Sequence, residues 1–327
     1  MYSKLNKFEW IAISVANEAG FDKLLWNERV VKGKEIINSY LNGSFDPEKC
    51  NLLLIKRLNE VKELVTGVAT QEPNIYLDAT ASGLQILSAI SLDLEAGNKV
   101  NIGTKERKDV YLETAKLFGE MFGLEIEREH VKKPLMTYFY NSRKNIEDYF
   151  GEEMAEMFFE MMEEGFKGPQ KVLNTVNKYF EPRKVFEYNL PDMKVSIPVE
   201  VSVTEDLKFK DIEEVPFTYK INQADKNQWR GLVPNIVHSL DAWILRYVVK
   251  QLNEEGIVVH TIHDSFQVPV SKAAELINAY KEAFITMVKD ELFPNIMKDL
   301  FDVEINYNSK RKAAMIEAIK RSEYMLS

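Results

Sequence analysis

Two short runs rich in valine and isoleucine enclose a carboxylate in the stretch Gly256–Val270. The polar tetrad His263-Asp264-Ser265-Phe266 separates the runs, and this pattern predicts a β-hairpin with Asp264 at its turn. A carboxylate beside so much β-branched surface is costly to bury unless it has a partner, and a divalent cation is a common partner. A second acid of the same kind would therefore indicate a metal site.

Such an acid lies far upstream. In Asn74–Gln85 a short apolar strand is predicted to end at Asp78, followed by a turn of small residues and a helix from about Gly83. Two carboxylates that converge from separate strands can hold a pair of metal ions in the geometry for in-line attack at phosphorus. Strand-end aspartates are also common in α/β domains without any such role, so the pair alone leaves a structural interpretation open.

A basic stretch, Arg128–Ser142, lies between the two acids. Arg128, Lys132, Met136 and Tyr140 recur every four residues, so on a helix they would form one stripe with two cations and an aromatic ring. Taken alone, the stripe is also typical of a solvated basic face above a Met/Tyr core.

The content and order of these stretches resemble the polymerase motifs of the bacteriophage and mitochondrial single-subunit RNA polymerase family. Asp78–Gln85 is similar to the first motif, Arg128–Ser142 to the second and His263–Phe266 to the third, while Pro234–Asp241 resembles a signature just before the third. The resemblance runs from about Leu5 to the end of the chain. It implies an α+β, mainly helical fold, with a palm whose small antiparallel sheet carries the catalytic aspartates and with helical fingers.

The resemblance also implies a division into parts. We expect a helical platform, a first palm segment, fingers that include a β-containing insertion, and a second palm segment with a C-terminal foot near Tyr324: residues 1–72, 73–125, 126–230 and 231–327. The role of the 185–230 insertion is not predicted.

DNA-templated RNA synthesis by two-metal-ion nucleotidyl transfer is the function that the resemblance implies. Asp78, Ala79 and Asp264 would hold two Mg²⁺ ions, and Lys132 and Tyr140 would complete the catalytic set. The substrates would be ribonucleoside triphosphates, with a DNA template and an RNA product.

Substrate selection is implied at five further positions. Arg128 would help Lys132 to neutralise the triphosphate, and Met136 fits the RNA-making branch of the family. Gly83 stands where related DNA polymerases carry a bulky acid that blocks the sugar 2′-hydroxyl, and His238 would contact that hydroxyl, with Asp241 orienting its neighbours. Without the resemblance, Gly83 is equally a turn residue, and a lone histidine is more often structural.

Two departures from the family pattern stand out. Pro134 predicts a helix that starts near Lys133 or kinks there, which puts the reach of Arg128 in question. Asn141 replaces the glycine that the family usually shows after the tyrosine, so translocation or sugar discrimination is expected to differ in detail.

The family's Gly-Arg motif is absent, because none of the 14 glycines is followed by arginine. We expect the thumb and the N-terminal promoter-binding region to be supplied by a second subunit, as in split two-subunit phage polymerases. The net charge of −9 agrees with a partner that contributes basic surface, since this chain has only local basic clusters for nucleic acid.

Composition limits the remaining possibilities. With 45% hydrophobic residues in 327, the chain can form a sizeable core, and its single cysteine excludes an internal disulfide. No apolar run is long enough for a membrane span and no signal-peptide core is present, so we expect a protein of the host-cell cytoplasm, in a phage-infected bacterium, that is not secreted.

Local patterns add three predictions. Pro234–Gln251 should be a helix with Pro234 in its first turn, Ser271 should cap a helix that runs to about Leu292, and Lys310–Arg321 should be the last helix. His263 should pack or hydrogen-bond behind Asp264.

Three other functions are compatible with parts of the pattern. A DNA polymerase of the related family is disfavoured by Gly83, Met136 and the His238 signature. A non-catalytic regulatory or recruitment subunit could keep the fold, although all three motifs are intact. A two-metal nuclease would leave the basic helix without a function.

Overall fold

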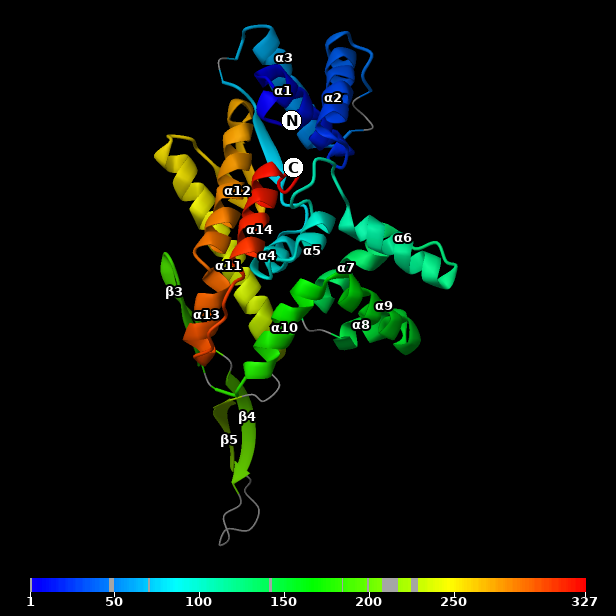
Figure 1. The fold of residues 1–327 in the computed structure, drawn as a ribbon. Coiled ribbons are helices and arrows are strands. Elements are labelled where there is room, and N and C mark those ends of the chain that lie inside the picture. Colours follow the sequence, from blue (N-terminus) through cyan, green and yellow to red (C-terminus); the bar gives the residue numbers. More distant parts are fainter. Residues whose placement is uncertain are drawn as a thin grey trace.

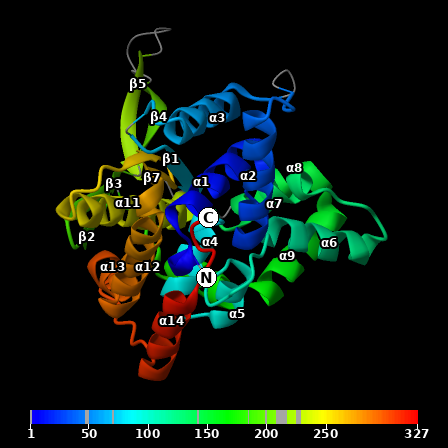
Figure 2. The same cartoon turned by 90° about the horizontal axis from the view of Figure 1, so that it is seen from above.

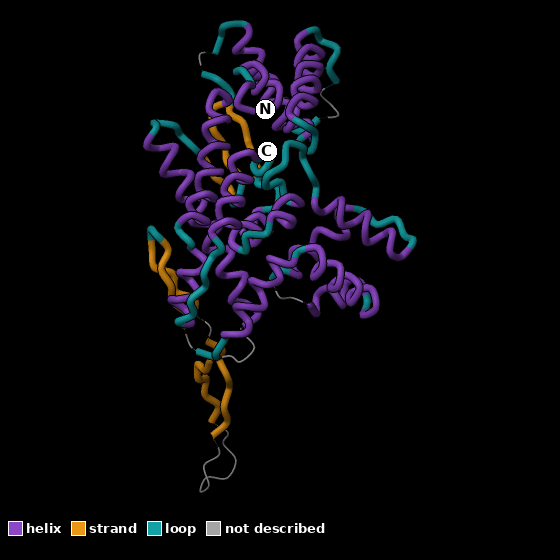
Figure 3. The backbone as a smooth tube through the Cα atoms, viewed as in Figure 1, coloured by secondary structure: helices purple, strands orange, loops and turns teal. Residues whose placement is uncertain are grey.

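The structure is a computed structural model that describes residues 2–46, 50–69, 71–140, 143–183, 185–198, 200–207, 217–224 and 229–327. Helices dominate this part of the chain, and its strands form three small antiparallel sheets (Figure 3). The expected α+β, mainly helical class is therefore confirmed.

The principal sheet brings together strands from opposite ends of the sequence. Its order is β1-β7-β6, with the bounds Asn74–Asp78 for β1, Ser265–Pro269 for β7 and His260–Ile262 for β6. Ser265 on β7 pairs with Asp78 on β1 and, on its other side, with Ile262 on β6. Alternate side chains of β1 and β7 enter the core, as expected for a sheet with one buried face: Ile75, Leu77, Phe266 and Val268.

The predicted hairpin is present, but only one of its arms is buried. Val258 and Ile262 before the turn are 64% and 62% exposed, whereas Phe266 and Val268 after it are buried. In the sheet, β7 is the central strand and β6 lies at one edge.

Three helices lie at one end of this sheet: α1 (Lys7–Ala16), α2 (Trp26–Leu41) and α3 (Leu52–Val65) (Figure 1). The sequence of α3 has apolar residues at helical spacing, Leu54, Leu58 and Val61, and all three are buried. Trp26 on α2 is fully buried and stacks on Tyr324 at 5.2 Å between ring centroids. Its indole N–H donates to the carbonyl of Glu323 at 3.1 Å, so the N-terminal helices are tied to the C-terminal segment. Figure 2 shows the two ends of the chain close together at the centre.

The middle of the chain is helical and extends to one side of the sheet (Figure 1). Helix α4 (Ser82–Ile90) follows β1 almost directly, and α5 (Leu94–Lys99) and α6 (Val110–Phe122) come next. The succeeding helices are α7 (Arg128–Tyr138), α8 (Arg143–Phe150), α9 (Glu152–Gly165) and α10 (Lys167–Tyr179). The junction of α9 and α10 coincides with Gly165 and the Gly168-Pro169 pair, residue types that commonly interrupt helices.

The long helix α11 (Trp229–Glu254) begins earlier than predicted. Pro234 is the sixth residue of α11 and therefore lies beyond its first turn. The predicted start of this helix at Pro234 is wrong. Tertiary packing outweighs the local rule here, because the side chains on both sides of the proline are in the core: Leu232, Val233, Ile236 and Val237.

The C-terminal helices are α12 (Ala273–Lys289), α13 (Leu292–Phe301) and α14 (Ser309–Arg321). The predicted last helix is confirmed as α14, but the predicted cap and end of α12 are wrong. Ser271 lies in a 3₁₀ turn before α12 and its hydroxyl donates to the Glu72 carboxylate at 2.6 Å, so it is not available to cap the helix.

Two hairpins lie between α10 and α11. The first consists of β2 (Val185–Leu190) and β3 (Met193–Pro198), and the second of β4 (Glu200–Leu207) and β5 (Phe217–Ala224). These strands are the β-structure expected in the 185–230 insertion, and the second hairpin projects from the body (Figure 1). Among the helices of the described residues, none is both long and apolar enough to cross a membrane.

Candidate active site

The two predicted acids, Asp78 and Asp264, meet at one end of the principal sheet. Asp78 ends β1, and Asp264 is in the two-residue turn before β7, where its carbonyl accepts a hydrogen bond from the Ala79 N–H at 3.2 Å. Strand register therefore fixes the two carboxylates side by side, although 186 positions separate them in sequence. Both line a pocket of about 280 Å³.

The surroundings of Asp78 disfavour its negative charge. Partial burial in the pocket and the neighbouring Asp264 raise the pKa of Asp78 to about 6, against the smaller opposing effect of Lys23 and Lys132. Two carboxylates held together in this way have a strong affinity for a cation.

The turn that presents Asp264 is strained. His263 has a φ of +54°, a left-handed conformation that is unfavourable for a residue with a side chain, and such strain is concentrated at functional sites. The imidazole is exposed, so the expectation that it packs behind Asp264 is wrong.

The basic stripe forms the facing wall. Helix α7 begins at Arg128, six residues before Pro134, and continues through the proline, so the predicted start near Lys133 is wrong. Val131, Pro134 and Leu135 are buried on the same side of the helix, and this packing holds the turn that the proline weakens. Because of this early start, Arg128, Lys132 and Met136 all reach the pocket.

The cations of this wall differ in their partners. The Nε of Arg128 donates to Asp109 at 2.8 Å and its Nη1 to Glu129 at 2.5 Å, while its guanidinium lies over the ring of Tyr111. Within the described residues Lys132 forms no ion pair. The charge of Arg128 is therefore partly compensated, whereas that of Lys132 is available to a ligand.

Tyr140 lies two residues beyond the end of α7 but still lines the pocket. Burial raises the pKa of its phenol, with smaller effects from Asp241 and Asp264, so the hydroxyl stays protonated and can donate a hydrogen bond. Its ring meets His238 edge-on at 5.3 Å between centroids. Asn141 lies outside the described residues.

Gly83 faces Tyr140. A Cβ at position 83 would lie 3.4 Å from the Tyr140 hydroxyl and 3.7 Å from Val237, so any larger side chain would project between α4 and the tyrosine. Its φ is not left-handed, and the backbone therefore does not require glycine here. The space beside Tyr140 is the feature that a glycine preserves.

His238 and Asp241, the two candidates on α11, do not reach the pocket lining. His238 is exposed, and its ring contacts that of Tyr140. Burial together with Asp264 raises the pKa of the Asp241 carboxyl to about 6, against the smaller opposing effect of Ser82 at the start of α4.

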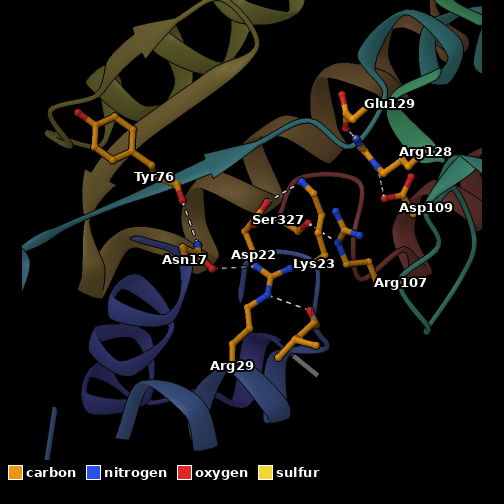
Figure 4. Close-up of polar contacts among 11 residues, drawn as sticks. Asn17, Asp22, Lys23, Arg29, Tyr76, Arg107, Asp109, Arg128, Glu129 and Ser327 are labelled. Carbon is orange, nitrogen blue, oxygen red and sulfur yellow. Dashed lines mark hydrogen bonds and ion pairs between the residues drawn. The ribbon is translucent and has the colours of Figure 1, made fainter. Parts of the chain in front are cut away.

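Several pocket residues were missed by sequence reasoning, among them Lys23, Arg107, Asp109 and Ser327. Figure 4 shows them between the N-terminal helices and the start of α7. Lys23 pairs with Asp22 at 2.5 Å, and Arg107 donates to the Ser327 hydroxyl at 3.4 Å. They come from loops and a chain end without periodic patterns, so their approach follows from tertiary packing alone.

The acid pair fits a divalent cation. Within the described residues no group of three or more His, Cys, Asp or Glu side chains could hold a metal. Mg²⁺ commonly binds through one or two carboxylates and takes its other ligands from water and substrate phosphates. Asp78 and Asp264, with the adjacent backbone of Ala79, match that type of site.

Comparison with known proteins places the chain in a family. A family model described as DNA-dependent RNA polymerase matches residues 4–193 and 198–325, which is nearly the whole chain. The chain belongs to this polymerase family. The phage and mitochondrial single-subunit type is the branch that the sequence motifs resemble.

Curated relatives in the family carry matching names. The chain is 26% identical to a probable DNA-directed RNA polymerase of Podospora anserina, over 89% of this chain and 39% of the relative. A probable DNA-directed RNA polymerase of Agaricus bitorquis is 24% identical, over 85% of this chain and 32% of its own length. A DNA-directed RNA polymerase of Pseudomonas phage phiKMV is also 24% identical, with 85% and 42% covered. The chain thus spans well under half the length of the polymerases it resembles.

Proposed function

We propose that this chain carries the catalytic centre of a DNA-directed RNA polymerase, which adds ribonucleotides to a growing RNA on a DNA template. The observation that supports this most strongly is the single pocket in which the Asp78–Asp264 pair faces Lys132, Arg128 and Tyr140. Family membership and the names of the relatives agree with it. In this proposal, β1, β6, β7 and the helices behind them form the palm, and α7 to α10 belong to the fingers.

Asp78 and Asp264, with the carbonyl of Ala79, would hold two Mg²⁺ ions. Bound there, the metal would activate the attacking 3′-hydroxyl and stabilise charge on the phosphate under attack. The strand register keeps both carboxylates at fixed positions, so they need no rearrangement when substrate binds.

The side chains of α7 act on the triphosphate. Lys132 offers its uncompensated ammonium to the phosphates, and Arg128, steadied by Asp109, supports it from one turn earlier. Met136 covers the pocket on the same face. These groups favour the transition state because negative charge accumulates on the departing phosphates.

Gly83, Tyr140 and His238 select the sugar. The absence of a side chain at Gly83 leaves room for a 2′-hydroxyl beside the Tyr140 phenol, and the His238 ring contacts the tyrosine ring from α11. A DNA polymerase is the second candidate, but a small residue at this position favours ribonucleotides.

The proposal is tested by template-directed ribonucleotide incorporation with Mg²⁺ on single-stranded DNA, using tagged protein purified from its native cells. Asp264→Asn should lower incorporation at least about a thousandfold, because one of two metal-binding carboxylates loses its charge. Equal incorporation by the wild type and the Asp264→Asn protein would refute the assignment. Native purification also tests the second subunit expected from the sequence, which stays a prediction.

A further inference from the structure

Arg107 adds a further cationic side chain to the pocket, on a loop that the sequence motifs do not cover. It lies between α5 and α6 and lines the pocket together with Lys23 and Ser327 (Figure 4). The contact of its guanidinium in the described structure is a 3.4 Å hydrogen bond from Nε to the Ser327 hydroxyl. Within the described residues, no carboxylate lies at ion-pair distance from it.

Arg107 and Arg128 line the same pocket but differ in their carboxylate partners. Arg128 has two carboxylate partners, Asp109 and Glu129. For Arg107, burial lowers the pKa, while Asp109 and Asp22 act only through longer-range attraction. A partly desolvated guanidinium without an adjacent counter-ion favours a bound anion, and its planar donors suit phosphate oxygens.

The loop that carries Arg107 is built to hold its position. Asn101, at a φ of +70°, accepts a hydrogen bond from the Lys108 N–H at 2.7 Å and donates to the Lys108 carbonyl at 3.0 Å. The same amide group donates to the Thr80 hydroxyl at 3.0 Å, two residues after Asp78. The residue next to Arg107 is therefore fixed to the turn that presents the first acid.

Arg107 lines the same pocket as Asp78, Asp264 and Lys132, and hydrogen bonds join its loop to the turn that follows Asp78. A triphosphate whose reacting phosphate lies at the two acids would have its other phosphates within this pocket, where Arg107 supplies planar donors. We propose that Arg107 binds the terminal phosphates of the incoming nucleotide and the pyrophosphate released from it, an inference that rests on the proposed function.

Binding of inorganic pyrophosphate to the intact chain, measured by calorimetry in the presence of Mg²⁺, tests this assignment without turnover. Arg107→Gln should raise the Kd for pyrophosphate about tenfold, as expected for loss of one charge-assisted contact, and change the Kd for a nucleoside monophosphate less than twofold. Arg107→Lys should recover part of the loss, and Lys105→Gln, which removes an exposed charge two residues away, serves as the matched control. Thermal unfolding of each variant shows whether a weaker affinity comes from the lost contact with pyrophosphate or from an unfolded protein.

Two results would overturn the inference. One is a pyrophosphate Kd for Arg107→Gln within twofold of that for Lys105→Gln. The other is an equal loss for monophosphate and pyrophosphate, which would indicate a general disturbance of the pocket. Neither result bears on the proposed function, because a polymerase that loses activity through Asp264→Asn would still stand without a role for Arg107.

Discussion

The two walls of the pocket differ in how much of their charge is already satisfied. On the sheet side (the acid wall), Asp78 lies beside Asp264, and burial together with this neighbouring charge raises the pKa of Asp78 to about 6. On the helix side, Arg128 is held by two carboxylates while Lys132 has none among the described residues. A bound cation would relieve the repulsion between the two carboxylates. On the helix side (the cation wall), the paired charge of Arg128 is suited to holding position, and the unpaired charge of Lys132 is suited to binding a ligand.

Within the cation wall, the largest expected effect tests how its two charges differ. Lys132→Gln should lower kcat/KM for ribonucleotides about a hundredfold, because an uncompensated charge on the triphosphate is lost. Arg128→Gln should lower it about tenfold, because Asp109 and Glu129 already compensate part of that charge. Steady-state kinetics measures kcat/KM for both variants, with Lys133→Gln as the control. A larger loss for Arg128→Gln than for Lys132→Gln would show that Arg128, not Lys132, is the main phosphate ligand.

The second effect concerns the space between the walls. Gly83→Glu should lower kcat/KM for ribonucleotides about tenfold to a hundredfold more than for deoxyribonucleotides, because the new side chain would fill the volume beside Tyr140. Gly83→Ala, with its Cβ 3.4 Å from the phenol, should change the ratio much less. The measurement is kcat/KM for incorporation of ribonucleotides and of deoxyribonucleotides. If the ratio of the two values is unchanged in Gly83→Glu, the sugar is selected at another position.

The smallest effect is on stability, and it has opposite signs for two aspartates. Asp78 has a folded-state pKa of about 6, above an unfolded value of about 3.9, so its contribution to stability is present below pH 4 and is lost as the pH rises through 6. Asp78→Asn should therefore raise the free energy of unfolding at pH 7.5 by about 1 kcal/mol, a figure reduced for the exposure of the group, and should leave it unchanged at pH 4.

Asp109→Asn is the matched comparison. Burial acts to raise the pKa of Asp109, but hydrogen bonds from Arg128 and the Leu112 N–H lower it below its ordinary value. Its stabilisation is present above the unfolded pKa and is lost as the pH falls, so Asp109→Asn should destabilise the protein at pH 7.5 by about 1 kcal/mol, while asparagine keeps the helix cap. Urea unfolding at the two pH values measures both, and the same sign for both variants would contradict the contrast.

Much of the acid wall could be predicted because short-range patterns determine it. Alternating β-branched residues and a polar turn locate Asp264, and a strand that ends in small residues locates Asp78. Their meeting was expected only through the family resemblance, since strand pairing between distant segments has no local signal.

The cation wall and the loops were less predictable. The proline rules place Pro134 and Pro234 at helix starts, yet both lie inside helices whose neighbouring side chains are buried, because packing energy exceeds the cost of one missing hydrogen bond. The ion pair of Arg128 with Asp109 and the approach of Arg107 and Lys23 join separate elements of the chain. Such contacts exist only once the tertiary structure has formed.

The central claim is that Asp78 and Asp264 together bind a divalent cation, and site-directed backbone cleavage tests it most directly. Fe²⁺ in place of Mg²⁺, with ascorbate and peroxide, generates hydroxyl radicals at the metal position. The account predicts cleavage near the end of β1 and in the β6–β7 turn, suppressed by excess Mg²⁺ and abolished in Asp78→Asn and Asp264→Asn. Cleavage at other segments, or a pattern that both variants retain, would contradict it.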